Sequence, residues 1–149
     1  MTPSWTLRAS LLFGALFTAS CASTSSGSKP EKPALERVDS LLQSGDLKAA
    51  RGALEEALQD DPDNLQANYL LGKTLSYLGE YRGAAARADW VLEHNPDYIL
   101  AWDLLGSARQ ALGEHRLAIA AFKEVQKRSE SSAPIVSIAQ CQLILGEPE

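Results

Sequence analysis

The chain has 149 residues, of which 22% are charged and 45% hydrophobic, and its formal net charge at pH 7 is −5. This length allows one domain of ordinary size and no second one. Its lysines and arginines are scattered among acidic residues, which argues against a nucleic-acid-binding protein, because such proteins ordinarily present a clustered basic face.

The first 20 residues have the pattern of a secretory signal. Arg8 precedes an apolar run over residues 9–19, which is shorter than the roughly 20 residues that a membrane-spanning helix needs. Residues 18–21 (Thr-Ala-Ser-Cys) resemble the bacterial lipobox, in which the cysteine sulfur receives a diacylglycerol. The resemblance implies that residues 1–20 are a lipoprotein signal peptide and that Cys21 becomes the lipidated first residue. An ordinary signal peptide cleaved beside Cys21 is the alternative.

A flexible tether is expected after the anchor. Residues 21–33 are rich in serine and offer little to bury, so they should form a mobile chain of roughly 20 Å root-mean-square reach. Two or three acyl chains, such as palmitate, would anchor firmly where one would come off. Ala22 is not the Asp that resembles an inner-membrane retention signal. The expected location is therefore the bacterial cell envelope, on the outer membrane and facing the periplasm.

A 34-residue period organises the rest of the chain. Gly45, Gly79 and Gly113 stand 34 residues apart, and each is followed by an acidic residue. A period of this size indicates a supersecondary unit that must stack on its neighbours to bury its apolar face. We therefore predict an all-α domain over residues 34–147, with three helical hairpins at about residues 31–64, 65–98 and 99–132.

The second repeat shows the apolar stripes most clearly. Leu71, Leu75 and Leu78 recur at helical spacing, which predicts a helix from about Leu65 to Leu78. The residues expected on the inner stripe of the following helix are Ala84, Ala88, Val91 and Leu92. Small residues at Ala84 and, one period later, Ala118 indicate where paired helices cross most closely.

Prolines separate the repeats. The second helix of the middle hairpin should end near Asn95, because Pro96 cannot continue a helix and disfavours the α conformation in the residue before it. Asp63 and Asp97 directly follow Pro62 and Pro96. Both aspartates are predicted to cap the helices that come next.

These positions resemble the tetratricopeptide repeat, whose first helix carries Trp, Leu, Gly and Tyr, whose second carries Ala, Phe and Ala, and which closes with Pro. The third repeat matches it at Trp102, Leu105, Gly106, Ala118 and Phe122. The second matches at Leu71, Gly72, Ala84 and Pro96, and the first at Leu41, Gly45, Ala50, Leu54, Ala57 and Pro62. The resemblance implies a solenoid of stacked hairpins with a concave groove lined by the first helices.

Several positions depart from that pattern. Asn68 replaces the Trp of the second repeat, and Ala88 replaces the aromatic residue. Arg109 lies on the apolar stripe of the third repeat, between Leu105 and Leu112. In the first repeat, Arg37 and Val38 stand where Leu and Gly are expected, so its first helix is the least well supported.

The last apolar segment predicts a capping helix over about residues 133–145, which would cover the open end of the third hairpin. Residues 145–147 (Leu-Gly-Glu) repeat the corner motif. If Cys21 is lipidated, Cys141 on this helix has no partner for a disulfide. We expect Cys141 to be buried as a small apolar residue, because no basic residue is placed in the sequence to activate its thiol.

Catalytic motifs are not visible, so we predict no enzyme, no cofactor and no metal site. The chain lacks G-x-S-x-G, G-x-x-x-x-G-K, H-E-x-x-H and a paired C-x-x-C. His94 and His115 fall near the end of one helix and the start of another, which would hold them apart. The acidic residues Glu55, Glu56, Asp60 and Asp61 are interpreted as a solvated helix face.

Candidate protein-binding residues lie on the side of the first helices that faces away from their partner helices. They are Tyr69, Lys73, Ser76 and Tyr77 in the second repeat and Asp103, Ser107 and Gln110 in the third. Two tyrosines beside polar groups would suit an extended or helical peptide. Each tyrosine could instead pack against the next hairpin. Trp90 could face the outer wall or close the seam with the third repeat.

The combination is similar to small tetratricopeptide lipoproteins of bacterial envelopes. It implies a membrane-anchored scaffold that binds protein or peptide partners, with neither nucleic acid nor a small-molecule substrate, in the assembly of an envelope complex. Two alternatives stay open: a structural lipoprotein that self-associates, and an accessory subunit of a cell-wall or secretion enzyme.

Overall fold

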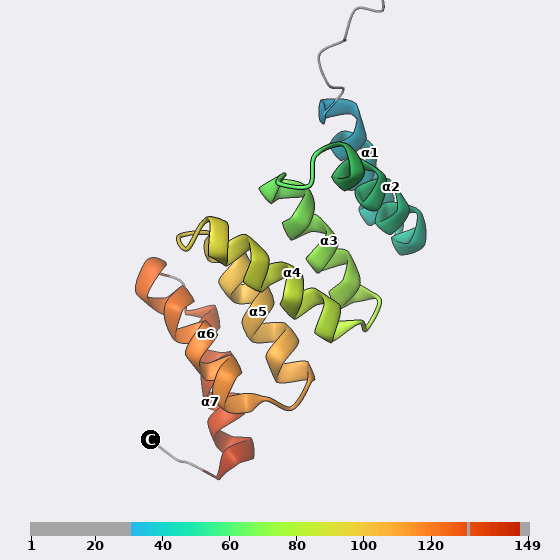
Figure 1. The fold of residues 1–149 in the computed structure, drawn as a ribbon. Helices are drawn as coiled ribbons and strands as arrows, with labels where there is room; N and C mark the ends of the chain where they lie inside the picture. Colours follow the sequence, from blue (N-terminus) through green and yellow to red (C-terminus); the bar gives the residue numbers. More distant parts are fainter. Residues whose placement is uncertain (1–30, 131, 147–149) are drawn as a thin grey trace, which may run out of the picture.

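The computed structural model describes residues 31–130 and 132–146, and every regular element within them is an α-helix (Figure 1). In chain order the helices are α1 (Glu31–Ser44), α2 (Leu47–Asp60), α3 (Leu65–Tyr77), α4 (Tyr81–His94), α5 (Ile99–Ala111), α6 (His115–Arg128) and α7 (Ala133–Leu145). The predicted fold is confirmed: three hairpins, α1–α2, α3–α4 and α5–α6, are followed by a C-terminal helix. None of these helices is both long and apolar enough to cross a membrane.

The predicted signal peptide, Cys21 and most of the tether lie outside the described residues, as does Glu147. The tether was expected to reach residue 33, whereas α1 begins at Glu31. Pro33 is compatible with this start. The first four N–H groups of a helix have no partner inside it, so a proline in the first turn sacrifices no hydrogen bond.

The hairpin corners have nearly identical backbone geometry. Gly45, Gly79 and Gly113 have φ angles of 78°, 78° and 77°, in the left-handed region that favours glycine. In each corner the acidic residue that follows donates its N–H back to the helix, as Glu80 does to the Leu75 carbonyl oxygen at 2.9 Å. This is the hydrogen bond that closes a glycine-terminated helix end, and it confirms the predicted corners.

The predicted caps at Asp63 and Asp97 are wrong by one residue. The N-cap of α3 is Asn64, whose side chain accepts from the Ala67 N–H at 2.9 Å. The N-cap of α5 is Tyr98, which makes no capping bond through its side chain. The link after Pro96 is a turn in which the Asp97 N–H donates to Oδ1 of Asn95 at 3.2 Å, and this turn moves the helix start beyond Asp97.

Small residues allow the helices to pack closely. Ala50, Ala84 and Ala118 share one position in the three hairpins and are fully buried. Gly72 and Gly106 occupy another shared position: an added Cβ would lie 2.9 Å from Cδ2 of Leu104 in the first case and 2.7 Å from Cε1 of Phe122 in the second. The predicted inner stripes form the core, with Leu71, Leu75, Ala84, Ala88, Val91 and Leu92 all buried.

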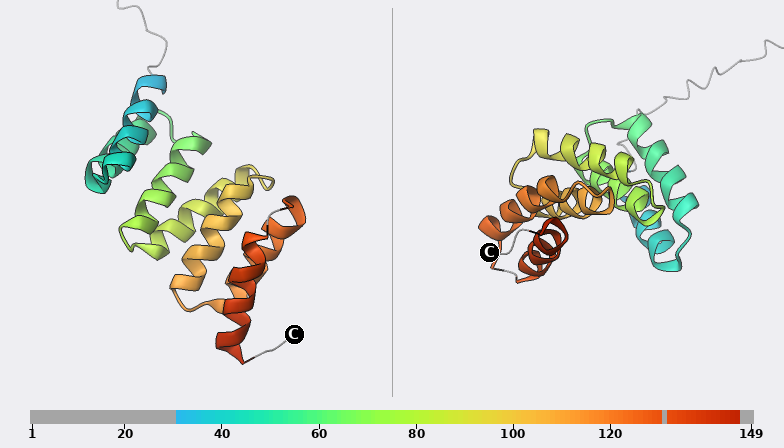
Figure 2. Two further views of the ribbon diagram at one scale, coloured as in Figure 1. Left: turned by 180° about the vertical axis from the view of Figure 1, so that it is seen from behind. Right: turned by 90° about the horizontal axis from the view of Figure 1, so that it is seen from below.

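The hairpins are arranged as a row, with α1 and α2 at one end and α6 and α7 at the other (Figures 1 and 2). α7 packs on α6, where Ile138 and Cys141 join Ala118 and Phe122 in a separate buried cluster. Cys141 is a free and fully buried thiol, as predicted, and its burial raises its pKa. The thiol is therefore kept protonated and covered.

Candidate functional site

The candidate residues lie on two first helices that touch each other. α3 carries Tyr69, Lys73, Ser76 and Tyr77, and α5 carries Asp103, Ser107 and Gln110. α3 and α5 are in direct contact, although a whole helix, α4, separates them in the chain. We call these seven residues the first-helix face.

The two tyrosines of α3 have different environments. Tyr69 is half-buried and packs against Tyr98, with ring centroids 5.4 Å apart. Burial raises the pKa of Tyr69, and neighbouring Tyr98, Asp103 and Tyr77 raise it further. Tyr77 is 59% exposed, and Nζ of Lys73 lies 5.9 Å from its ring centroid, within cation–π range. Tyr69 therefore helps to hold adjacent repeats together, whereas Tyr77 is accessible to a partner.

The third repeat contributes polar groups to the same face. Asp103 and Ser107 are exposed, and partial loss of solvent raises the pKa of the Asp103 carboxyl. Gln110 is half-buried and donates to Oε1 of Gln140 on α7, at 3.5 Å. The first-helix face thus presents an aromatic ring, a cation and a carboxylate from adjacent repeats.

Tyr98 and Gln66 also belong to this region, although the repeat pattern singles out neither of them. The Tyr98 hydroxyl donates to Oε1 of Gln66 at 2.9 Å, which ties the start of α5 to α3. Burial raises the pKa of Tyr98. Tyr98 lies in the link between repeats, outside any helical stripe, so periodicity gave no signal for it.

The departure from the repeat pattern at Asn68 has a structural explanation. Trp102 donates through Nε1 to the carbonyl oxygen of Pro96 at 2.8 Å, and Asn68, one period earlier, donates through Nδ2 to that of Pro62 at 2.9 Å. Oδ1 of Asn68 accepts from Nη1 of Arg87 at 2.8 Å. The buried amide of Asn68 thus makes the same backbone contact as the indole of Trp102. Arg87 stands at the position that Ala121 occupies one period later.

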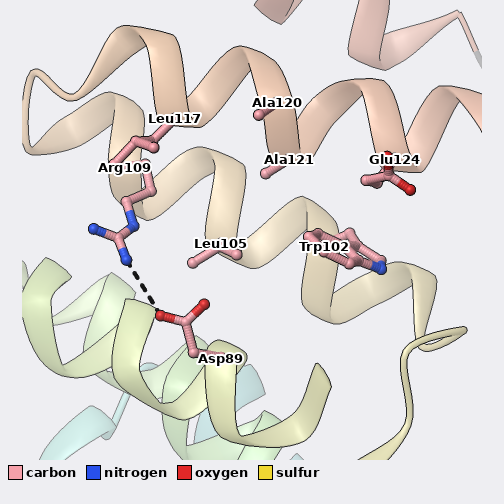
Figure 3. A pocket seen from close by; sticks show the side chains of 8 residues that line it. All are labelled: Asp89, Trp102, Leu105, Arg109, Leu117, Ala120, Ala121 and Glu124. Atoms are coloured by element: carbon pink, nitrogen blue, oxygen red, sulfur yellow. Dashed lines mark hydrogen bonds and ion pairs between the residues drawn. The ribbon is translucent and has the colours of Figure 1, made fainter. Parts of the chain in front are cut away.

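A cavity of about 380 Å³ opens between α4 and the third hairpin, α5–α6 (Figure 3). Its apolar lining comes from α5 and α6: Trp102, Leu105, Leu117, Ala120 and Ala121. Asp89, Arg109 and Glu124 supply the charged part of the lining. The repeat pattern does not predict this cavity.

Arg109 explains how a charge is accommodated on an apolar stripe. Its guanidinium reaches out of the seam to Asp89 of α4 at 3.2 Å and to Glu114 at 2.6 Å. Both carboxylates raise the pKa of Arg109, chiefly through the hydrogen bond to Glu114. The residue therefore joins α5 to the neighbouring hairpin.

His94 and Glu55 make contacts within their own helices. Nδ1 of His94 lies 2.8 Å from the Trp90 carbonyl oxygen, and its ring stacks on Trp90 with centroids 3.9 Å apart. Trp90 is half-buried against the core. Glu55, at the solvent side of α2, pairs with Arg51 at 2.8 Å. Within the described residues, no group of three or more His, Cys, Asp or Glu side chains could hold a metal ion.

Comparison with known proteins identifies related sequences and folds. Two tetratricopeptide repeat family models match, one over residues 41–108 and the other over residues 99–132. Solved structures with a similar fold include MamA from MSR-1, at 25% identity and a TM-score of 0.72 over 80% of this chain and 69% of that one. A search of curated proteins found no match.

Two further similar structures are less close in sequence and show the fold alone. MamA from Desulfovibrio magneticus RS-1 has 19% identity and a TM-score of 0.75, over 78% of this chain and 67% of that one. TTC0263, a thermophilic TPR protein of Thermus thermophilus, has 23% identity and a TM-score of 0.69, over 78% and 66%. This chain spans about two thirds of the length of these structures.

Proposed function

Because this chain belongs to the tetratricopeptide repeat family, we propose that it is a lipid-anchored scaffold whose first-helix face binds a protein or peptide of the bacterial envelope. The family and fold are those of a protein-interaction scaffold. One observation carries the proposal for this particular face: Tyr77 is 59% exposed, with Lys73 over its ring. An exposed aromatic of this kind supplies a large contact area at low conformational cost.

The chemistry of the face indicates what the partner must offer. Tyr77 would contact an apolar side chain, Lys73 would pair with a carboxylate, and Asp103 would accept from a donor one repeat away. Ser107 adds a small hydroxyl on the same helix as Asp103. A peptide with alternating polar and apolar side chains fits this set, bound as an extended segment or as a short helix.

Anchoring forms the second part of the proposal. The lipobox-like residues 18–21 support lipidation of Cys21 after removal of residues 1–20. The tether that follows would place the hairpins in the periplasm beside the outer membrane, free to rotate toward a membrane-bound partner. We propose that the scaffold assists the assembly of an envelope complex.

Site-directed photo-crosslinking in cells tests the binding face directly. A photoreactive phenylalanine analogue would replace Tyr77 in one strain and Leu117 in another. Leu117 is a matched control, because it is 53% exposed but lies beside the cavity on the other side of the hairpins. We expect a discrete crosslinked protein from position 77, identified by mass spectrometry, and little from position 117.

A substitution pair completes the test. Tyr77→Ala should weaken capture of that partner at least about tenfold, since truncating an interface hot spot costs about 2 kcal/mol or more. Leu117→Ala should leave capture unchanged, and circular dichroism should show native helix content in both variants. If position 117 crosslinks and position 77 does not, the partner binds at the cavity and the first-helix face is the wrong site.

A further inference from the structure

Helix α7 carries no charged residue from Ala133 to Leu145, in a chain of which 22% is charged. One side of it is accounted for by the fold, because Pro134, Ile138 and Cys141 are buried, the last two with Ala118 and Phe122 of α6. The contact with α6 thus uses only part of the apolar surface that α7 carries.

The opposite side of α7 is largely apolar and exposed. The residues that form it, which we call the outer face of α7, are Ile135, Val136, Ala139, Gln140, Leu143 and Ile144. The exposed fractions of its four large aliphatic side chains are 51% for Ile135, 59% for Val136, 82% for Leu143 and 62% for Ile144. Their spacing spreads them over the half of the helix opposite its buried residues, with Val136 and Leu143 at the centre of that half. α7 itself lies at the end of the row of hairpins (Figure 2). A contiguous exposed apolar surface of this kind marks an interaction site.

The outer face includes Ala139, at a position that the second helix of the hairpin covers in the second and third repeats. Gly72, Gly106 and Ala139 each stand at the same interval before the glycine that ends their helix. An added Cβ at Gly72 or Gly106 would touch the second helix of the same hairpin, at Arg87 or Phe122. Ala139 is exposed, so no helix of the described residues fills this place on α7. A small residue there lets another helix approach closely.

The aliphatic residues of this face are placed symmetrically along α7. Ile135 and Val136 precede the midpoint between Ala139 and Gln140 by the same intervals at which Ile144 and Leu143 follow it. A two-fold axis through that midpoint would place Val136 of one copy against Leu143 of another, on antiparallel helices. Antiparallel packing is also how the two helices of each hairpin meet. The outer face of α7 is thus complementary to itself in polarity, spacing and absence of charge.

We propose that a second copy of this chain packs on the outer face of α7, forming a homodimer through antiparallel α7 helices. This contact does not depend on the partner proposed for the first-helix face, although the two surfaces adjoin where Gln140 accepts from Gln110. An interface confined to one helix from each copy is small, below about 1,200 Å² in total, so the dimer should be reversible and should depend on concentration. Its two-fold geometry closes after two copies and does not lead to filaments.

Cysteine crosslinking of the full-length chain in cells tests the proposal. Ala139→Cys places a thiol beside the two-fold axis, and a short, membrane-permeant bismaleimide would join two such thiols. Ala86→Cys is the matched control, because Ala86 is also an exposed helical alanine, on α4. The unsubstituted chain measures any background from Cys21. We expect a product of twice the chain mass from Ala139→Cys and none above background from Ala86→Cys.

Charge substitutions then test the register. In the Ala139→Cys background, Leu143→Glu should lower the crosslinked fraction at least about tenfold, because it would bury an uncompensated carboxylate. Val136→Lys should do the same. The two together should restore crosslinking, since each lysine would then face a glutamate of the other copy. All of these positions are exposed, so circular dichroism should stay native.

Three outcomes would overturn the homodimer. One is equal crosslinking from Ala139→Cys and Ala86→Cys; another is a crosslinked product whose mass identifies a different protein. The third is a Leu143→Glu variant that crosslinks as well as its parent. If the double variant fails to recover while both single variants lose crosslinking, the antiparallel arrangement is refuted.

Discussion

Asn68 donates a hydrogen bond from Nδ2 to the carbonyl oxygen of Pro62 at 2.9 Å, across the link between the first two repeats. Its Oδ1 accepts from Arg87, so the fully buried amide joins three segments. We expect Asn68→Ala to destabilise the fold by about 1–3 kcal/mol, because it leaves buried polar groups without their partner. Urea denaturation followed by circular dichroism measures this loss.

A double-mutant cycle isolates the pair. Because Asn68 and Arg87 share one hydrogen bond, Asn68→Ala and Arg87→Ala should lose less together than the sum of their separate losses, with a coupling of about 0.5–3 kcal/mol. Strict additivity would show that the contact contributes nothing. Asn68→Trp combined with Arg87→Ala copies Trp102 and Ala121 of the third repeat, so it should be more stable than Asn68→Trp alone.

Close helix packing predicts opposite effects at two glycines. Gly106→Ala would place a Cβ 2.7 Å from the Phe122 ring, and we expect a loss of about 1–3 kcal/mol from overpacking. Gly52→Ala, in α2, meets nothing within 4 Å and should stabilise the protein by about 0.5–1 kcal/mol. Thermal unfolding of the two variants against the parent decides the sign. A neutral Gly106→Ala would mean that the ring moves aside at no cost.

Asp103 predicts a pH-dependent difference in stability. Partial loss of solvent around this exposed carboxyl raises its pKa in the folded state, so its charge disfavours folding once the pH rises above the pKa of the unfolded chain. Asp103→Asn removes that penalty. We expect the variant to be more stable than the parent at pH 7 and the difference to vanish below about pH 3, where the carboxyl is protonated in both states.

Urea titrations at the two pH values test this difference. Asp39→Asn, at an exposed position of α1, controls for the general effect of removing one negative charge. An Asp103→Asn variant with the same advantage in acid as at neutral pH would contradict the explanation by titration.

Lipidation at Cys21 predicts a chemical label. Cells that express the full-length chain in the presence of radioactive palmitate should label the mature protein. Cys21→Ser should abolish the label, because the sulfur that receives the lipid is lost. Cys141→Ser should keep it, since Cys141 is buried on α7. Labelling that persists in Cys21→Ser would refute the anchor.

The sequence predicts the fold well where the signal is local. A glycine followed by an acid at a fixed interval specifies the corners, because few other residues adopt their positive φ. The leucine and alanine stripes identify the buried sides of α3 and α4 by period alone. The helices after Pro62 and Pro96 start one residue later than the sequence predicts. The turns before them depend on side chains, such as Asn95, that accept hydrogen bonds from the backbone.

The candidate site is less predictable, because it depends on contacts between repeats. Tyr69 and Tyr77 are equivalent by spacing, and only the position of Tyr98 on the next repeat separates a packed ring from an exposed one. Asn68 stands where the next repeat has Trp102, and its hydrogen bond from Arg87, which explains this difference, is visible only in the structure. The lack of charge on α7 is visible in the sequence, but which of its sides remains uncovered is not.

The three internal corners keep one backbone geometry although the seams beside them differ in side chains. A whole 34-residue unit could therefore be inserted or deleted without demanding a new bend from the chain. Such a protein can lengthen or shorten by gain or loss of whole units while α1 and α7 stay as they are. The length of the row of hairpins would then change in steps of one unit, independently of the residues that contact a partner.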